Sequence, residues 1–256
     1  MMIKEKSFKA SARIARKLGV AAPAKRFLRN TPGPISKMIK QREIEQRVKL
    51  VDDQAINEAM QKVAAFVKEE GIEVDTYLEF GVYNGSTITA MTRALDAAGI
   101  KGVRVFGFDT FEGLPEFAST DCGGHWKPGE FHSSIEFTRS VLEHEQVDMG
   151  KVELVKGLFS ESCTPEFIEK HNIGKASLVM IDCDLYQSTV DALAFCKPVF
   201  ADTTVVLFDD WFPLADQNEG EKPAWDEFLA ANPQWHAEEM FGYAPHGLVF
   251  KLTRVG

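Results

Sequence analysis

Short apolar runs alternate with stretches of helical spacing through most of this chain, and this alternation constrains the fold more than any other feature. The apolar runs predict strands over 76–80, 103–108, 152–155, 178–181 and 205–208. Helical spacing between the runs predicts helices over 86–98, 134–145, 165–171 and 187–197. Buried strands separated by helices are typical of a parallel sheet built from βαβ units.

The C-terminal part of the chain breaks this rhythm. Apolar segments over 235–241 and 247–252 are separated only by a turn that contains Gly and Pro, as in a hairpin. We therefore expect an α/β domain with a Rossmann-like, mostly parallel seven-stranded sheet. An antiparallel C-terminal hairpin should extend that sheet, and helices should cover both of its faces.

Charge is divided unevenly along the chain. The formal net charge is −9, yet residues 1–49 hold 14 Lys and Arg against 3 Asp and Glu, a formal +11 that leaves −20 for the remainder. Two Pro-containing breaks interrupt this basic segment. We expect a helical arm and linker over 1–43, then one domain over 44–256 that begins with an amphipathic helix from Ile44 to Val67.

The same charge pattern bears on partners. An acidic domain argues against a broad contact with nucleic acid. We expect the basic arm to pack on a neighbouring subunit, forming a homo-oligomer, or to close over the ligand pocket. The acidic domain is compatible with a cationic cofactor or a divalent metal ion, although net charge alone identifies neither.

The cysteines favour a reducing compartment. Cys122, Cys163, Cys183 and Cys196 show no C-x-x-C spacing, so neither a zinc site nor a disulfide framework is indicated. The sequence has no apolar run of about 18 residues, and residues 1–20 lack the apolar stretch of a secretory signal. We expect a cytoplasmic protein without a membrane span. A mitochondrial presequence is the alternative that the basic, acid-poor start leaves open.

Polar residues gather at the expected carboxyl ends of the strands, where ligands bind in a sheet of this kind. Gly81 and Gly85 follow the first strand, although a tight turn alone accounts for such a pair. Glu79 and Asp109 close the first two strands, where they suit an ammonium group and two ribose hydroxyls, respectively. Ser86 lies at the expected helix start, where it can help to hold a carboxylate.

The glycine pattern separates two classes of cofactor. A nicotinamide dinucleotide requires G-x-G-x-x-G, whose second glycine lets the backbone reach a pyrophosphate. Tyr83 occupies that position here, and neither Asn84 nor Ser86 restores the pattern. A ribose without a pyrophosphate fits S-adenosylmethionine far better than NAD. We therefore expect a methyltransferase and not a nicotinamide oxidoreductase.

Four aspartates cluster after the fourth and fifth strands. Asp182 and Asp209 directly follow apolar runs, and Asp184 and Asp210 lie beside them. Carboxylates at adjacent strand ends repel one another unless a cation lies among them or some are protonated. A hard divalent ion, Mg²⁺ before Ca²⁺ or Mn²⁺, resolves this repulsion most simply. In the alternative, Asp184 and Asp210 cap helices and Asp182 touches only the cofactor.

These motifs resemble the macrocin O-methyltransferase family. YLEFGVYNGST, GFDTFEGLPE, VKGLFSES, IDCDLYQST and LFDDW carry the resemblance, which covers about residues 75–253. The family's sugar-modifying members serve macrolide and aminocoumarin antibiotic pathways. The resemblance implies a class I methyltransferase fold. It also implies transfer of a methyl group from S-adenosylmethionine to a hydroxyl of a sugar or another vicinal diol, assisted by Mg²⁺.

The resemblance further implies roles for individual residues. It assigns Asp182, Asp209 and Asp210 to the metal and leaves Asp184 as the general base. Strand alternation should direct Asp182 and Asp184 to the same side. The residues implied or expected to contact the cofactor are Glu79, Gly81, Tyr83, Gly85, Ser86, Asp109, Thr110, Phe111, Gly157, Phe159, Ser160 and Asp182. The chain departs from the family at SCTPEF, where Thr-Leu-Pro is frequent, and at Asn84, where a basic residue is frequent.

A loop over Thr120–Ser134 holds a second candidate base. His125 and His132 follow the second strand, where a lid would cover the substrate. A surface loop with incidental histidines is the plainer interpretation. Nearby aromatics such as Trp211 and Trp225 line either a pocket or the core.

Two rival functions stay open at this point. A metal-independent methyltransferase acting on nitrogen or on an easily ionised hydroxyl would remain active in a chelator. A non-catalytic protein that uses S-adenosylmethionine as a regulatory ligand would bind it without forming product.

Overall fold

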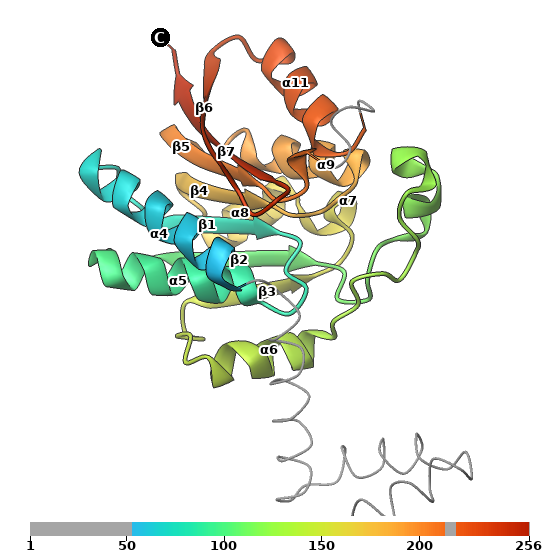
Figure 1. Cartoon of the computed structure of the whole chain (residues 1–256), viewed down its shortest axis with the longest axis horizontal. Coiled ribbons are helices and arrows are strands. Elements are labelled where there is room, and N and C mark those ends of the chain that lie inside the picture. The colour runs from blue at the N-terminus through green and yellow to red at the C-terminus, as the bar shows by residue number, and fades with distance from the viewer. Residues whose placement is uncertain (1–52, 213–218, 256) are drawn as a thin grey trace, which may run out of the picture. The chain divides into compact units, whose positions relative to one another are not determined.

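The computed structural model describes residues 53–212 and 219–255 of the chain. Its centre is a seven-stranded sheet in the order β3-β2-β1-β4-β5-β7-β6 (Figure 1). The strands are β1 (Thr76–Phe80), β2 (Arg104–Asp109), β3 (Val152–Lys156), β4 (Ala176–Ile181), β5 (Phe200–Phe208), β6 (Trp235–Tyr243) and β7 (Gly247–Arg254). Strands β1 to β5 are parallel to their neighbours among themselves, whereas β7 is antiparallel to both β5 and β6. The predicted fold class is therefore confirmed.

Helices cover both faces of this sheet (Figure 1). They are α4 (Asp53–Glu69), α5 (Ser86–Ala98), α6 (Ile135–His144), α7 (Phe159–Ser162), α8 (Pro165–His171), α9 (Tyr186–Cys196) and α11 (Glu221–Ala231). Helix α4 packs against α5, and α9 packs against α11. Strand β1 is buried along its whole length because it lies between these two layers. Within the described residues, no helix is both long and apolar enough to cross a bilayer.

Side-chain alternation along β1 directs its residues to two different layers. Leu78 and Phe80 belong to the core cluster that contains the apolar residues of α9. The Phe80 ring stacks on Phe108 of β2 with ring centroids 5.1 Å apart, and Phe195 of α9 packs edge-on against both. Glu79, between them in sequence, instead reaches Thr87 of α5. The strand thus places a carboxyl group among apolar neighbours.

The predicted elements agree closely with these bounds. Strand β1 and helices α5 and α8 begin and end where the sequence predicts, and the other predicted strands and helices are present with ends shifted by one to five residues. Helices α7 and α11 were not predicted. The arm over 1–43, its proposed role in assembly, and the first part of the helix predicted from Ile44 lie outside the described residues and stay predictions.

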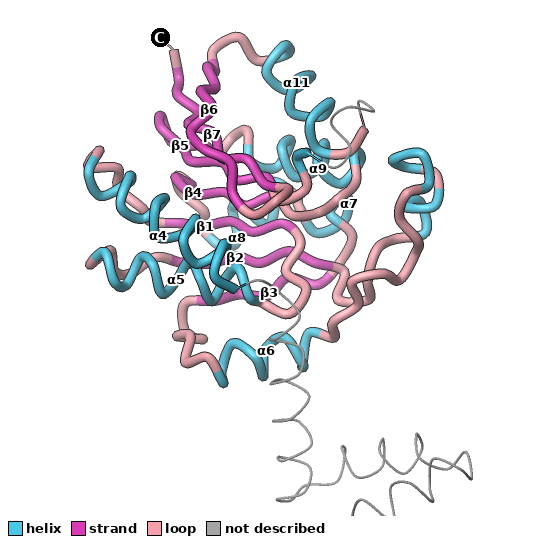
Figure 2. Tube along the Cα trace, in the orientation of Figure 1, coloured by secondary structure: helices cyan, strands magenta, loops and turns pink. Residues whose placement is uncertain are grey.

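Residues 114–130 form a separate loop between β2 and α6, visible in Figure 2 as a projection from the domain. The N–H of Leu114 donates to the carbonyl oxygen of Glu130 (2.9 Å). The N–H of Gly129 donates to the carbonyl oxygen of Leu114 (2.8 Å). The two ends of the loop are thus held together. Two short 3₁₀ helices, η1 (Glu116–Ser119) and η2 (Asp121–Gly124), lie inside it, where the sequence predicted only a loop from Thr120 onward.

A small apolar cluster attaches this loop to the rest of the domain. Ala118 and Cys122 of the loop pack against Leu185, which directly precedes α9. The carboxylate of Asp121 accepts hydrogen bonds from the backbone N–H groups of Tyr186 (3.1 Å) and Gln187 (3.0 Å). Because the first N–H groups of a helix lack partners within it, Asp121 caps α9 from a distant part of the chain.

Candidate active site

The loops after β1 and β4 meet at Gly81. This residue has a φ of +87°, and a Cβ added to it would lie 1.6 Å from the carbonyl oxygen of Asp182. The N–H of Asp182 also donates to the carbonyl oxygen of Phe80 (2.8 Å). Only glycine fits here, because any side chain would strike the backbone of the neighbouring loop. Gly81 therefore brings the loop after β1 into contact with the loop that carries the aspartates.

Gly85 makes a similar close approach to a different element. It precedes α5 with a φ of +83°, and a Cβ there would lie 2.8 Å from Cδ2 of Leu142 in α6. Tyr83 also has a positive φ, of +47°, and its carbonyl oxygen accepts a hydrogen bond from the hydroxyl of Thr138 (2.5 Å). The loop after β1 is thus held in shape by α6.

Asn84 lies at the centre of this loop and is buried. Its Oδ1 accepts a hydrogen bond from the N–H of Ser86 (3.1 Å), whereas its Nδ2 is buried and has no hydrogen-bond partner among the described residues. Leaving such a donor unsatisfied costs roughly 1–3 kcal/mol. A ligand carrying an acceptor oxygen would recover that cost.

Asp109 binds the backbone of two loops. Its Oδ2 accepts from the N–H groups of Val82 (2.8 Å) and Tyr83 (2.9 Å), and its Oδ1 accepts from the N–H of Phe111 (2.7 Å). A carboxylate offers about four acceptor positions, and the hydroxyl of Thr110 makes a fourth, long contact with Oδ1 (3.5 Å). The predicted bidentate contact with two ribose hydroxyls would have to compete with these donors, and it stays a prediction. The sequence could not show this, because most of these donors are main-chain groups.

Glu79 is fully buried, and both of its oxygens already accept hydrogen bonds. Tyr77 donates to Oε2, and the hydroxyl of Thr87 donates to Oε1 (2.6 Å). Burial raises the pKa of Glu79 to about 8, although the hydrogen bonds from Thr87 and Tyr77 oppose the shift. The carboxyl group thus joins β1 to α5. The predicted contact of Glu79 with an ammonium group, through bound water or directly, stays a prediction.

The other residues assigned to the cofactor lie at the ends of β2 and β3. Phe111 has a φ of +54° and a buried side chain, so only its backbone faces the loop. Thr110 donates to the carbonyl oxygen of Gly113 (2.7 Å). The N–H of Gly157 donates to the carbonyl oxygen of Asp109 (3.0 Å), which joins the two loops. Phe159 packs edge-on against Phe80, and Ser160 beside it is exposed.

The structure brings Asp182, Asp209 and Asp210 together. Each offers one carboxylate oxygen, and these three atoms all lie within 4.8 Å of one another. Burial raises the pKa of Asp182 well above its ordinary value, and Asp209 and Asp210 raise it further. Burial likewise raises the pKa of Asp209, and that of Asp210 to about 6. Three carboxylates this close together repel one another when all are ionised, unless a cation lies among them.

Asp184 also lies beside these aspartates, but for a different structural reason than we predicted. Strand β4 ends at Ile181, and Asp184 has a φ of +61°, so strand alternation does not direct its side chain. It is buried and shares a side-chain hydrogen bond with Asp210. Burial, followed by the charge of Asp210, raises the pKa of Asp184 well above its ordinary value. A left-handed turn, and not the strand, thus directs Asp184 to the cluster.

Three further residues interact with the aspartates and were not predicted from the sequence. Glu221 of α11 is buried and accepts from the N–H groups of Asp210 (3.1 Å) and Cys183 (3.5 Å), so it ties together the loops after β4 and β5. Tyr243 of β6 forms a hydrogen bond with Asp209, and His246 in the β6–β7 turn lowers the pKa of Asp209 and Asp210. Nothing in the sequence indicates that α11 and the hairpin reach this site.

The structure does not place His125 at the aspartates. His125 is exposed and packs edge-on against Trp126, with ring centroids 4.8 Å apart. Within residues 53–212 and 219–255, no hydrogen bond or ring contact joins it to the cluster, whereas His246 lowers the pKa of Asp209 and Asp210. Trp211 and Trp225 are buried and belong to the core cluster.

The strand order and the C-terminal hairpin define this chain as a class I methyltransferase fold. Residues 47–233 match the model of the Macrocin-O-methyltransferase (TylF) family. The chain belongs to this family, as the sequence motifs indicated.

One curated relative is similar over part of its length. It is the 8-demethyl-8-(2,3-dimethoxy-alpha-L-rhamnosyl)-tetracenomycin-C 4'-O-methyltransferase of Streptomyces olivaceus, which is 27% identical over 151 residues. The match covers 57% of this chain and 56% of the relative, so it spans little more than half of that protein.

Two solved structures share the fold. The O-methyltransferase NovP superposes with a TM-score of 0.61 at 22% identity, over 78% of this chain and 80% of its own. The apo structure of CalS11, a TDP-rhamnose 3'-O-methyltransferase in calicheamicin biosynthesis, gives 0.54 at 20% identity, over 90% of each chain. At these identities the likeness shows the fold alone.

Proposed function

We propose that this chain transfers a methyl group from S-adenosylmethionine to a hydroxyl of a sugar or another vicinal diol, with a divalent metal ion bound by Asp182, Asp209 and Asp210. The observation that carries this proposal is the approach of three carboxylate oxygens to within 4.8 Å of one another. Membership of a family named for O-methyl transfer supports it, as does a relative whose name describes methylation of a rhamnosyl group.

The chemistry of the three aspartates fits a hard divalent cation. Mg²⁺ prefers carboxylate oxygens as protein ligands, and Ca²⁺ and Mn²⁺ accept the same set. The raised pKa values of Asp182, Asp209 and Asp210 also favour a bound cation, because it would stabilise their ionised forms. When bound, the ion would hold two adjacent hydroxyls of the acceptor and lower the pKa of the hydroxyl to be methylated.

The loops after β1, β2 and β3 are the proposed cofactor site. The buried, unpaired Nδ2 of Asn84 supports this proposal, since a carboxylate of the ligand would satisfy it. Asp109 is the proposed acceptor for the ribose, and Gly157 lies beside it. When bound there, S-adenosylmethionine supplies the electrophilic methyl group. These loops would hold it beside the aspartates, because Gly81 contacts the backbone of Asp182.

Asp184 is the proposed general base. It is buried and hydrogen-bonded to Asp210, so an acceptor hydroxyl held by the aspartates would be near it. In-line methyl transfer requires the acceptor oxygen about 3 Å from the methyl carbon and removal of its proton. Glu221 and Tyr243 are positioning residues, because they hold the backbone and side chains of the aspartates in place.

Two substitutions separate the roles of the metal ligands and the base. Asp209→Asn preserves shape but removes a charge, so Mg²⁺ affinity and turnover should fall together while binding of S-adenosylhomocysteine persists. Asp184→Asn should retain Mg²⁺ and lower turnover by roughly 10²–10⁴-fold, the usual contribution of a positioned base. Mg²⁺ titration and initial rates with a rhamnoside acceptor measure both effects.

The matched control is Asp202→Asn, because Asp202 lies on the exposed start of β5, away from the carboxyl edge. That variant should behave as the wild type in both measurements. Full activity of the wild type in excess EDTA would disprove the metal role, and the aspartates would then act as caps and cofactor contacts only.

A further inference from the structure

The turn that carries Asp184 has a strained backbone. Asp184 has a φ of +61°, and the N–H of Leu185 donates to the carbonyl oxygen of Cys183, two residues back. A three-residue turn with a positive φ at its centre is the rarer and more strained form of the γ-turn. Such strain is retained only where the surrounding structure holds it. The elements around Asp184 must therefore hold the turn.

The first half of the turn is held from the side of the sheet. The N–H of Asp182 donates to the carbonyl oxygen of Phe80 (2.8 Å), and the N–H of Cys183 donates to the carboxylate of Glu221 (3.5 Å). Neither contact reaches past Cys183. The second half of the turn must be held by other residues.

The loop over 114–130 contacts that second half. Leu185 is fully buried and packs against Cys122 of the loop. Sγ of Cys122 lies 3.5 Å from the carbonyl oxygen of Asp184 and 2.9 Å from Oδ1 of Asp121. The loop therefore meets the turn at its backbone as well as at an apolar side chain.

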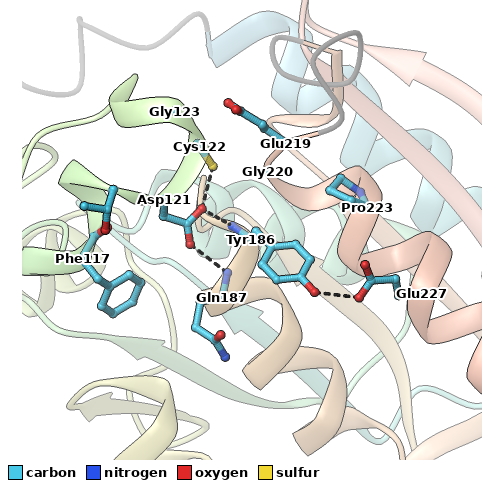
Figure 3. Close-up of a pocket in the computed structure, with 11 residues that line it drawn as sticks. Phe117, Asp121, Cys122, Gly123, Tyr186, Gln187, Glu219, Gly220, Pro223 and Glu227 are labelled. Carbon is cyan, nitrogen blue, oxygen red and sulfur yellow. Dashed lines mark hydrogen bonds between the residues drawn. The ribbon is translucent and has the colours of Figure 1, made fainter.

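Asp121 fixes the residues that directly follow the turn. Its two carboxylate oxygens accept from the N–H groups of Tyr186 (3.1 Å) and Gln187 (3.0 Å), the first two residues of α9, as the dashed lines in Figure 3 show. Leu185 precedes the helix and offers no side-chain cap, so the carboxylate of Asp121 takes this role. A negative charge at the start of a helix is also electrostatically favourable. Asp121 thus holds the chain from the second residue after Asp184.

We propose that Asp121 is a positioning residue for Asp184: by holding the start of α9, it keeps the turn in the conformation that directs the carboxyl group of Asp184 to Asp210. The inference rests on the role proposed for Asp184 as general base. Asp184 and Asp210 share a side-chain hydrogen bond, and a turn relaxed to a negative φ would direct the side chain elsewhere. The loop over 114–130 and the base therefore act as one unit.

Asp121→Ala and Thr164→Ala form a matched pair. Each removes a side chain that caps a helix, since Thr164 accepts from the N–H of Phe167 at the start of α8 (3.2 Å). The two variants should therefore show similar falls in the urea midpoint. Only Asp121→Ala should lower kcat with a rhamnoside acceptor, by about 10–100-fold, the order expected for a displacement near 1 Å. KM for S-adenosylmethionine and the dissociation constant for Mg²⁺ should change less than about twofold.

Hydrogen exchange of the Leu185 amide reports on the turn without cofactor, metal or acceptor. This N–H closes the turn by donating to Cys183. Its exchange should be at least about tenfold faster in Asp121→Ala than in the wild type, and unchanged in Thr164→Ala. NMR of the full chain measures both rates.

Two further variants separate positioning from general damage. Asp121→Asn retains one acceptor oxygen for the start of α9, so its kcat should lie only about threefold below that of the wild type. It also carries the comparison with Thr164→Ala should Asp121→Ala fail to fold. Asp121→Ala added to Asp184→Asn should not lower kcat further, because the group to be positioned is already absent.

Four results would each overturn the inference. They are an unchanged kcat in Asp121→Ala, an equal loss in Thr164→Ala, unchanged exchange of the Leu185 amide, and a further loss in the double variant. Failure of the proposed function is a separate result. A wild-type rate in Asp184→Asn would refute the base whatever the amide exchange shows, and full activity in EDTA would refute only the metal.

Discussion

Replacing Gly81 with alanine should disrupt the junction between the cofactor loop and the aspartate loop. The new Cβ would have to move from 1.6 Å to at least 3.0 Å from the carbonyl oxygen of Asp182. That shift would break the hydrogen bond from Asp182 to Phe80, which is 2.8 Å long, and strain the one from Gly81 to Phe108, which is 2.9 Å.

The cost of this change can be worked from its parts. Each backbone hydrogen bond contributes about 1 kcal/mol. The left-handed backbone conformation costs alanine about 1 kcal/mol relative to glycine, and displacing packed backbone costs about 1–3 kcal/mol. The free energy of unfolding should therefore fall by about 4 kcal/mol. Affinity for Mg²⁺ should fall as well, because Asp182 would be displaced.

A matched control isolates the steric effect from the backbone effect. Gly102 has nearly the same φ, +83°, but a Cβ there would meet nothing within 4 Å. Gly102→Ala should therefore cost only about 1 kcal/mol. Urea denaturation followed by circular dichroism measures both variants. If Gly81→Ala and Gly102→Ala agreed within about 0.5 kcal/mol, the margin within which independent effects usually add, the close approach would have no energetic weight and the reasoning would fail.

Two other predictions concern the carboxyl groups of the cofactor loops. The folded pKa of Glu79, about 8, lies above its ordinary 4.5, so its contribution to stability is complete below pH 4.5 and is lost as the pH rises toward 8. The difference in unfolding free energy between the wild type and Glu79→Gln should therefore fall between pH 5 and 8, by up to about 1.4 kcal/mol per pH unit. Urea denaturation at a series of pH values measures this difference, and a difference that does not change with pH would contradict the raised pKa. Asp109→Asn should destabilise the fold by about 2–3 kcal/mol, because three N–H groups lose a charged acceptor, and should weaken S-adenosylhomocysteine binding in calorimetry. Loss of binding without loss of stability would mean that Asp109 acts on the ligand alone.

The elements predicted best are those whose ends carry local signals. Helix α8 begins with Pro165 after Thr164, whose hydroxyl caps the helix. It ends at His171, and the next residue, Asn172, has a left-handed conformation. Helix α5 lies between Gly85 and Gly99, which both have a positive φ. Strand β5 begins five residues earlier than predicted, because its first half is only partly buried and lacks a continuous apolar run. The missed helix α11 has Pro223 in its first turn, where proline is tolerated but resembles a break.

The candidate site was predictable only where its residues follow apolar strands. Asp182 and Asp209 satisfy this condition, so their proximity followed from the expected sheet. Glu221 and His246 do not, because an unpredicted helix and a hairpin turn carry them to the site. The partners of Asp109 and Glu79 were equally hidden. A sequence shows which residue is acidic, but not which main-chain N–H or hydroxyl reaches its oxygens.

The two ends of the loop over 114–130 are joined, and this affects how that part of the chain can vary. Leu114 is paired with Gly129 and Glu130, so the chain leaves the sheet and returns to it at one place. Lengthening a loop whose ends are already joined costs little, roughly 0.6 kcal/mol for each doubling. Residues 114–130 should therefore be replaceable by the corresponding loop of another enzyme. The new loop must contain a carboxylate that, like Asp121, accepts hydrogen bonds from the first N–H groups of α9. A chimera would carry a different loop beside α9 while the sheet and its aspartates stayed unchanged.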